Sequence, residues 1–481
     1  MPTVASIMKR GCWGQTWGPE LISEHGVWVS LFSGISRSLH GYYYFRQLKP
    51  GTYDLETVTG YSIDSPPFWF YLIGREKKVA IIDVPDSNPI PKLPGIQIAN
   101  WSVHDSWNPG YIPTMSEPSG LINEVYQKFG QKLTPIENLD SSIDQDQELY
   151  YQLLGRVKKK GTLCINLIGR DRFDTVVVIF SESHAASHQF WKYHVEAQGG
   201  DTIKDDLTHA IRDVYRAIDR EIGLLLAKLP RESNIFIVSS VGMEDDYPTT
   251  GLIEAFCRKL GYQTPPEYNG FSLKPMDLVR RFVPESWRIS LSRYLPREKR
   301  ESLLADQFQS STNWHKTTAF AIPSAYTSFI RVNLRGREPE GIVKPGSEYL
   351  VLLDQIEADL KQLVDPESNE PAVTRIAKTV ELFSCTPHPS LPDLFIEWKP
   401  GRFIQRVVHP RAELVQKKPD FFRRSDHSQN GFVAAMGPSI QGQGLLCDIK
   451  VLDLATTFLF LIGAPIPETM TGRTIKSILH G

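Results

Sequence analysis

The sequence predicts an α/β fold in which buried parallel strands are covered by helices. Residues 175–180 (TVVVIF) form a run of β-branched and aromatic side chains, which is typical of a buried parallel strand. Residues 235–240 (IFIVSS) form a second such run, and a long helical pattern at 203–229 separates the two. Strands alternate with helical patterns along most of the chain, which favours an α/β sandwich.

The other expected elements follow in chain order. Residues 1–14 contain a short helical pattern at Val4, Ile7 and Met8, and Ser23 or Glu24 is placed to cap a helix that runs to Phe32 and closes at Gly34. Further strands are predicted at 77–85, 329–333, 394–398 and 431–435, and further helices at 121–130, 144–158 and 453–463.

The length favours one large domain with an insertion over several small domains. Residues 264–312 are basic and helical and lack strand patterns, so we expect an inserted helical cap there. Residues 1–263 and 313–481 are then the two parts of one core. A solvated helix face explains the arginines of the cap better than an anion clamp does.

Composition excludes several classes of function. The net charge of −2 and the pI near 6.7 give no electrostatic argument for binding nucleic acid or an anionic membrane. No apolar run reaches the roughly 18 residues of a membrane span, and the N-terminus lacks a signal-peptide pattern. The five scattered cysteines contain no CxxC pair, which favours reduced thiols. We therefore expect a soluble cytoplasmic protein with a small-molecule substrate and no nucleic-acid or membrane partner, and the sequence leaves a homo-oligomer open.

The clearest chemical signal follows the strand at 175–180. Ligands of open α/β sheets gather beyond the carboxyl ends of the strands, and the segment 181–188 (SESHAASH) stands at such an end. His184 and His188 are four residues apart, which places both imidazoles on one face of a helix, as a metal site requires. In the alternative, one histidine caps the helix and the other packs under Trp191. The spacing alone does not decide between these readings.

Several short motifs occur in an order that resembles a known family. They are residues 28–34 (WVSLFSG) with His40-Gly41, residues 78–85, 180–191 and 238–243, Ser425-Asp426-His427, and residues 453–457 with 463–465 and 472–473. Together they resemble the alkaline phosphatase superfamily, in its type I phosphodiesterase and nucleotide pyrophosphatase branch. The resemblance covers nearly the whole chain. It implies a three-layer sandwich with a central, mostly parallel sheet.

The resemblance also implies which residues hold metal. The ligands of the family's first metal fall on His184, His188 and His427. The family's second metal loses its Asp-His pair, because these positions hold Ser240 and Val241. The Asp at the end of the family's first strand has no counterpart, since the chain is expected to begin after that strand. The resemblance therefore implies one zinc ion in place of two.

Three neutral imidazoles leave the full charge on a zinc ion and one tetrahedral position open. Such a site lowers the pKa of bound water from 15.7 to about 7, or polarises an ester oxygen as a Lewis acid. Two carboxylates stand close to the ligands in sequence. Glu182 is a candidate general base or ligand partner, with a salt-bridged or capping carboxylate as the alternative, and Asp426 is a candidate to orient a ligand's other ring N–H.

The remaining candidates line the expected pocket. The family's nucleophile position falls on Glu24, which suggests an acid/base group or a helix N-cap, and the adjacent Ser23 is a weaker nucleophile candidate. His25 is a candidate for substrate binding. His104 and Asp105 follow a strand and either line the pocket or lie on a surface loop.

Three functional hypotheses follow. The first is a metal-dependent hydrolase or transferase that uses a single zinc on three histidines to act on a phosphate ester or related ester. The second is a non-catalytic scaffold or binding protein on the same fold. The third keeps the zinc as a Lewis acid for a different reaction, such as a condensation, elimination or isomerisation.

Overall fold

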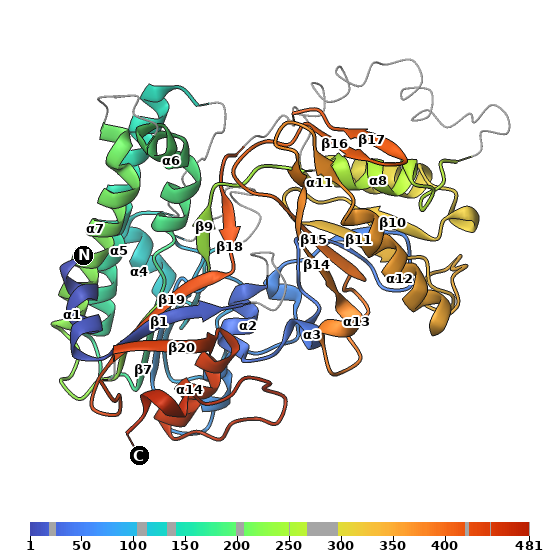
Figure 1. The fold of residues 1–481 in the computed structure, drawn as a ribbon. Helices are drawn as coiled ribbons and strands as arrows, with labels where there is room; N and C mark the ends of the chain where they lie inside the picture. The colour runs from blue at the N-terminus through green and yellow to red at the C-terminus, as the bar shows by residue number, and fades with distance from the viewer. Residues whose placement is uncertain are drawn as a thin grey trace.

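The computed structural model describes residues 1–18, 26–102, 113–131, 141–198, 206–249, 251–266, 297–418, 423–442 and 444–480. The molecule has two lobes (Figure 1). The first carries both ends of the described chain and the candidate site. The predicted α/β class is confirmed, with helices and several sheets.

One sheet of the first lobe contains four strands between residues 79 and 178. Its order is β6 (Met115–Glu117), β5 (Gly95–Ala99), β4 (Val79–Ile82) and β7 (Thr175–Val178). β5, β4 and β7 run parallel, and β6 is antiparallel to β5. The predicted strand at 77–85 therefore exists as the shorter β4.

A second sheet lies in the same lobe. Its order is β20 (Gly444–Lys450), β1 (Cys12–Trp17), β19 (Asn430–Met436) and β8 (Ile235–Ser239). β1 is parallel to β20, and β19 is antiparallel to both β1 and β8. The described strands of this lobe thus include two separate four-stranded sheets, where the sequence predicted one central sheet.

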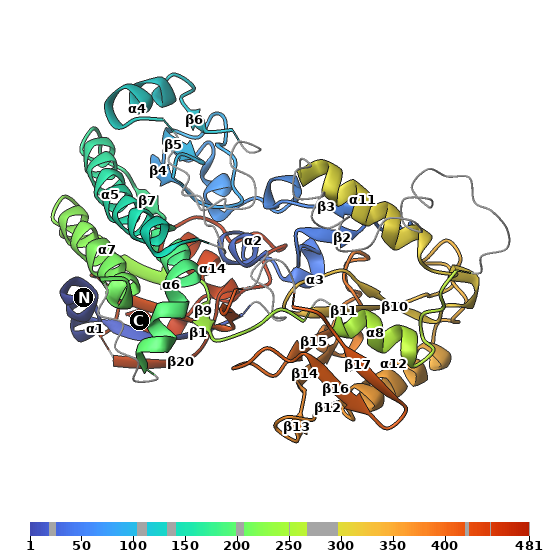
Figure 2. The ribbon, with the colours of Figure 1, turned by 90° about the horizontal axis from the view of Figure 1, so that it is seen from above.

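Helices cover the sheets on two sides. The side chains of β4 show this, since they alternate between two hydrophobic cores. Ala80 and Ile82 pack with Leu163 and Leu167 of one helical layer, whereas Val79 and Ile81 face the opposite layer. The first layer contains α1 (Pro2–Arg10), α4 (Leu121–Phe129), α5 (Ile143–Ile168), α6 (Glu182–Gln198) and α7 (Ala210–Leu226). Figure 2 shows α5, α6 and α7 packed side by side.

The opposite layer contains α2 (Val27–Ser33), η2 (Phe68–Leu72) and α14 (Leu452–Ile462). Gly34 closes α2 with a φ of 65°, as predicted, since glycine adopts this conformation without strain. The predicted N-cap was wrong, because Gly26 holds that position. The short elements ahead of the second lobe in the chain, or at its end, are α3 (Arg37–His40), β2 (Arg46–Leu48), β3 (Leu55–Thr57), η1 (Gly60–Ser62), η3 (Asp206–His209) and η5 (Lys476–Ile478). Leu48 of β2 and Leu55 of β3 pack in the aromatic core of the second lobe.

The second lobe has its own sheets and core. One sheet has the order β10 (Ala319–Ile322), β11 (Ser328–Val332), β15 (Leu394–Trp398) and β14 (Val373–Lys378). The other has the order β13 (Glu370–Pro371), β12 (Val364–Asp365), β16 (Arg406–His409) and β17 (Ala412–Val415). Its helices are α8 (Leu252–Lys259), α11 (Arg297–Ser310), η4 (Trp314–Lys316), α12 (Ser347–Leu360) and α13 (Thr379–Leu382).

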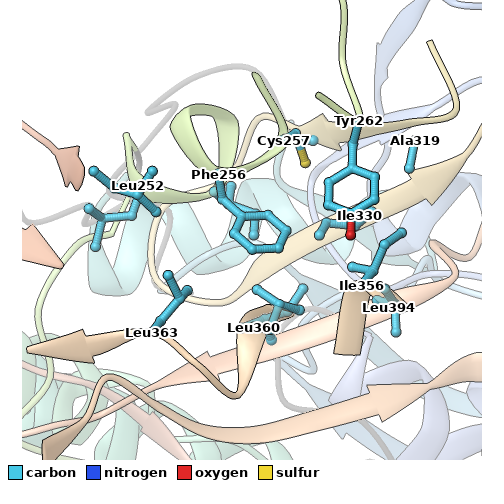
Figure 3. Close-up of a cluster of buried hydrophobic side chains, with 14 of the residues drawn as sticks. Leu252, Phe256, Cys257, Tyr262, Ala319, Ile330, Ile356, Leu360, Leu363 and Leu394 are labelled. Atoms are coloured by element: carbon cyan, nitrogen blue, oxygen red, sulfur yellow. The ribbon is translucent and has the colours of Figure 1, made fainter. Parts of the chain in front are cut away.

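Side chains of α8 point toward those of the sheet and of α12 in this core, as Figure 3 shows for Phe256, Ile330 and Leu360. The core joins residues on both sides of the predicted cap, from Leu252 to Tyr262 and from Ala319 to Leu414, and the boundaries at 264 and 313 stay a prediction. Most of the predicted cap, residues 267–296, lies outside the described part of the chain. Its described helix α11 contacts β3, and Leu55 of β3 packs in the same cluster as Phe308 of α11.

A final antiparallel pair, β9 (Gly242–Glu244) and β18 (Asp426–Ser428), lies between the lobes and beside α6 (Figure 1). Among the described helices, none is long and apolar enough to cross a membrane.

Candidate metal centre

The first two histidines sit where β7 passes into α6. β7 ends at Val178, and α6 begins at Glu182. His184 and His188 are therefore in the first two turns of the helix, and their ring centroids lie 4.5 Å apart. His188 is buried with 4% exposure, whereas His184 is half-buried and lines a cavity.

The third histidine comes from the distant strand β18. Antiparallel pairing sets His427 opposite Met243 of β9, which directly follows β8. His427 is 5% exposed, and its ring stacks on that of His184 at an angle of 15°. The pairing with β9 thus delivers His427 to the end of the sheet where α6 begins.

The three rings turn the same kind of atom toward a common point. The Nε2 atom of His427 lies 2.9 Å from Nε2 of His184 and 3.3 Å from Nε2 of His188. One nitrogen from each ring lies within 4.8 Å of the other two. With Zn–N distances of about 2.0–2.1 Å, tetrahedral geometry requires nitrogen separations of roughly 3.3 Å. The predicted convergence of His184, His188 and His427 is therefore confirmed.

Polar groups behind the rings fix their orientation. Nδ1 of His427 lies 2.9 Å from Oδ1 of Asp426, and Nδ1 of His188 lies 3.3 Å from Oγ of the buried Ser425. Because a carboxylate only accepts, neutral His427 donates from Nδ1 and turns a bare Nε2 lone pair toward the other rings. That arrangement suits a cation at the centre, so the donor set fits a metal ion such as zinc. The predicted contact of Asp426 with a ligand's other ring nitrogen is confirmed.

The centre opens into a cavity of about 1260 Å³. His184 and His427 form part of its wall, together with Ser240 and Val241. These last two stand where the resemblance places a second Asp-His pair, and a hydroxyl and an alkyl group do not replace those ligands. In the described residues, the three histidines are the single cluster able to hold a metal.

Two further carboxyl groups lie close to Asp426. Burial, followed by the charge of Asp426, raises the pKa of Asp246 to about 8. The same two causes raise the pKa of Glu244, which pairs with Asp426 across the β9–β18 ribbon. A cation held by the histidines would favour the charged forms of these carboxyl groups.

Glu182 belongs to a buried ionic network behind the centre. Its Oε1 accepts a hydrogen bond from Ser102 at 3.0 Å and lies 3.4 Å from the guanidinium of Arg156. Lys160 contacts Asp83 at 3.1 Å and donates to the carbonyl of Ile179 at 2.9 Å, just ahead of α6. These contacts agree with the salt-bridged reading of Glu182, whose fully buried carboxylate anchors the turn that begins α6. Its role as general base stays a prediction.

The remaining candidates cannot be placed. Ser23, Glu24, His25, His104 and Asp105 all lie outside the described residues. His40, which the sequence suggested to be structural, is buried and lies 2.8 Å from Oγ of Ser30.

Two features of the centre were missed from sequence. Ser425 gave no signal beyond its position next to Asp426. The sequence did hold a signal for Lys160. This lysine lies in the apolar stripe of α5 with Leu153, Val157 and Cys164, where a charged side chain needs buried partners.

The chain was compared with curated proteins, solved structures and family models. No curated protein matches the sequence. Two solved structures align over all of this chain and 94% of their own: human ectonucleotide pyrophosphatase/phosphodiesterase 5, at 12% identity and a TM-score of 0.49, and its murine counterpart, at 14% and 0.48. The sequence model of the type I phosphodiesterase/nucleotide pyrophosphatase family matches residues 1–262, more than half of the chain. The protein therefore belongs to the type I phosphodiesterase/nucleotide pyrophosphatase family.

Proposed function

We propose that the protein is a mononuclear zinc enzyme that hydrolyses or transfers a phosphate ester, with His184, His188 and His427 as the zinc ligands. The observation that carries the proposal is the convergence of three Nε2 atoms from two distant segments beside a large cavity. Membership of a phosphodiesterase family supports a phosphoric ester as the substrate class.

The donor set supports one ion. Ser240 and Val241 line the same cavity but offer no second pair of ligands. The three imidazoles are neutral donors, and Asp426 sits behind His427, where it contributes charge without occupying the open side.

The side chains of this chain have defined tasks in such a site. Asp426 holds the Nδ1 proton of His427 and thereby keeps Nε2 free, and Ser425 holds the ring of His188 in place. A zinc ion bound there supplies Lewis acidity and brings the pKa of water to about 7. The cavity wall beside His184, formed in part by Ser183 and Ser187, gives an ester polar contacts at the centre.

Metal analysis and kinetics on the same preparations test the proposal. Protein purified without added zinc should contain close to one equivalent of zinc, and His188→Ala should lose it. His209→Ala is the matched control, because His209 is exposed and lies outside the cluster. Aryl phosphates, phosphodiesters, sulfates and carboxylic esters should be screened, and a chelator should abolish turnover of a phosphate ester. Metal-free protein with undiminished turnover would refute the proposal.

A binding or scaffold role is the second candidate. It is favoured by Ser240 and Val241, because their positions lack the family's second set of ligands. In that case the protein binds zinc through the three histidines, yet none of the ester classes is turned over. A zinc enzyme of another reaction class would also fail to turn over the esters. It would instead turn over a carbonyl substrate, and a chelator would abolish that turnover.

A further inference from the structure

Helix α6, which carries two of the three histidines, is joined to α5 by two ion pairs. Near the start of α6, Glu182 lies 3.4 Å from the guanidinium of Arg156 on α5. Further along α6, Lys192 contacts Asp146 of α5 at 2.7 Å. The two helices therefore run antiparallel, and we call these two ion pairs the α5–α6 clamp.

The two pairs of the clamp match in spacing and in sign. Asp146 and Arg156 are ten residues apart on α5, as are Glu182 and Lys192 on α6, and ten residues of a helix span ~15 Å. Each helix carries its negative charge first and its positive charge second, so antiparallel packing sets every charge opposite its counterion. Asp146 and Glu182 are fully buried. A shift of α6 along α5 would move both buried carboxylates away from these cations, which is costly in a low-dielectric interior.

Further hydrogen bonds hold both ends of the clamp. Asp146 accepts from Gln189 and from Tyr193 of α6, each at 2.6 Å. Glu182 accepts at 3.0 Å from Ser102, which follows β5. α6 is therefore attached on both sides of its two histidines, once before the first and once after the second.

The contact between the two attachment points is apolar. Leu149 and Leu153 of α5 belong to one hydrophobic cluster with Ala185 and Ala186 of α6. Apolar contact is non-directional, and alanines form shallow ridges on a helix, so this contact alone defines the position of α6 along α5 only weakly. Buried polar contacts are the groups that can specify the register of two packed helices.

We propose that the α5–α6 clamp fixes the axial position of α6 and thereby places His184 and His188 against His427. This inference rests on the proposed zinc centre, and it makes the four clamp residues positioning residues that act through the histidines. His427 is set separately, by the pairing of β18 with β9. A metal site tolerates about 0.2 Å in its ligand distances, whereas a slip of α6 by one residue moves its ligands by ~1.5 Å.

A distance measurement on metal-free protein tests the clamp directly. Nitroxide labels on a ketone-bearing amino acid, placed at the exposed Lys159 of α5 and His194 of α6, report the position of α6 along α5 by pulsed electron paramagnetic resonance. The double variant Asp146→Asn/Glu182→Gln keeps the shapes of both side chains and removes their charges. Its label distance should shift or broaden by at least ~1.5 Å, the rise of one residue. A folded double variant with the wild-type distance would overturn the proposal.

Zinc affinity, measured by competition with a chelator, tests the consequence for the histidines. The double variant should bind zinc at least tenfold more weakly than wild type. Asp393→Asn is the matched control, because it removes the charge of another buried carboxylate, which Arg337 contacts at 2.7 Å in the second lobe. Zinc affinity of this control should stay within twofold of wild type. An equal loss in Asp393→Asn would assign the effect to reduced stability, and wild-type affinity in the double variant would refute the positioning role.

A half-buried clamp residue gives a milder variant in case the double variant does not fold. The side chain of Lys192 is 31% exposed, so Lys192→Met removes one pair at a site open to solvent. It should shift the label distance and weaken zinc binding at least threefold, whereas Lys192→Arg should retain both wild-type values. Wild-type values for Lys192→Met would contradict the proposal. Wild-type protein that binds no zinc would refute the proposed function, and the label distance would still decide whether the clamp sets the position of α6.

Discussion

His184 and His427 stand 243 residues apart in the chain, yet their Nε2 atoms lie 2.9 Å apart. His184 is set by the first turns of α6, and His427 by the pairing of β18 with β9. The ligand set is complete only when both segments are in place. Binding of a metal there is consequently coupled to the folding of the first lobe.

Zinc should therefore stabilise the protein against denaturant. A ligand that binds only the folded state at 100 times its Kd adds about 2.7 kcal/mol to the free energy of unfolding. His427→Ala should lose this increment, whereas His480→Ala, at an exposed position, should keep it. Urea unfolding with and without zinc measures the difference. A zinc increment that survives in His427→Ala would show that the metal binds elsewhere.

Asp426 should matter for metal affinity although it lies behind the ligand. Its carboxylate fixes the His427 ring through the 2.9 Å contact to Nδ1, and loss of such a partner typically weakens metal binding 10–100-fold. We expect that loss for Asp426→Ala and a smaller one for Asp426→Asn, which keeps an acceptor oxygen. Competition with a chromophoric chelator measures zinc affinity, with the exposed Asp64→Ala as control. Equal affinity of wild type and Asp426→Ala would contradict this role.

The sequence predicted the histidine centre because its signals are local. His184 and His188 follow a strand at helical spacing, and Asp426-His427 is a compact motif. The order of the motifs then placed these segments at one site. Motif spacing and order do not reveal that the first lobe has two four-stranded sheets in place of one. The number of sheets depends on which strands, far apart in sequence, pair with each other.

Strand β1 shows where local patterns fail. Cys12–Trp17 contains Gly14 and Gln15, and it lacks the β-branched run that marks β7 or β8. It is a strand because β19 and β20 pair with it on both sides, so long-range pairing overrides its weak propensity. The helix predicted at 144–158 is likewise shorter than the observed α5, which ends at Ile168. Lys160 interrupts the apolar stripe of this helix, which continues to Leu167.

The buried ionic network should be costly to break. Lys160 is fully buried and contacts Asp83 at 3.1 Å, so Lys160→Met leaves the buried carboxylate of Asp83 without this cation. Removing one partner of a buried pair typically costs about 3–5 kcal/mol. Lys159→Met, on the exposed side of the same helix, should change stability by less than about 0.5 kcal/mol. Denaturant unfolding of both variants measures the contrast, and similar losses in the two would disprove it.

His40 should make the protein sensitive to acid. Burial, followed by the charges of Arg37 and His388, lowers the pKa of His40 from 6.5 to about 3. The amide of Tyr42 donates to Nδ1, so neutral His40 donates from Nε2 to Oγ of Ser30, and a second ring proton would have no acceptor. Between pH 6.5 and about 3 the unfolded chain binds a proton that the folded chain does not, so acid weakens folding through this window.

The stability that His40 contributes is thus present above pH 6.5 and is lost as the pH falls toward 3. We expect His40→Asn to lower the free energy of unfolding at pH 7 by about 1–3 kcal/mol, because it disturbs the hydrogen bonds of a buried side chain. Below pH 6 the variant should lose stability more slowly than wild type, by roughly 1 kcal/mol per pH unit, since one proton accounts for about 1.4 kcal/mol per unit. Urea unfolding from pH 7 to pH 4.5 measures both slopes, with His480→Asn as the exposed control. Parallel slopes for wild type and His40→Asn would assign the acid sensitivity to other groups, because a buried neutral imidazole is the property that the substitution removes.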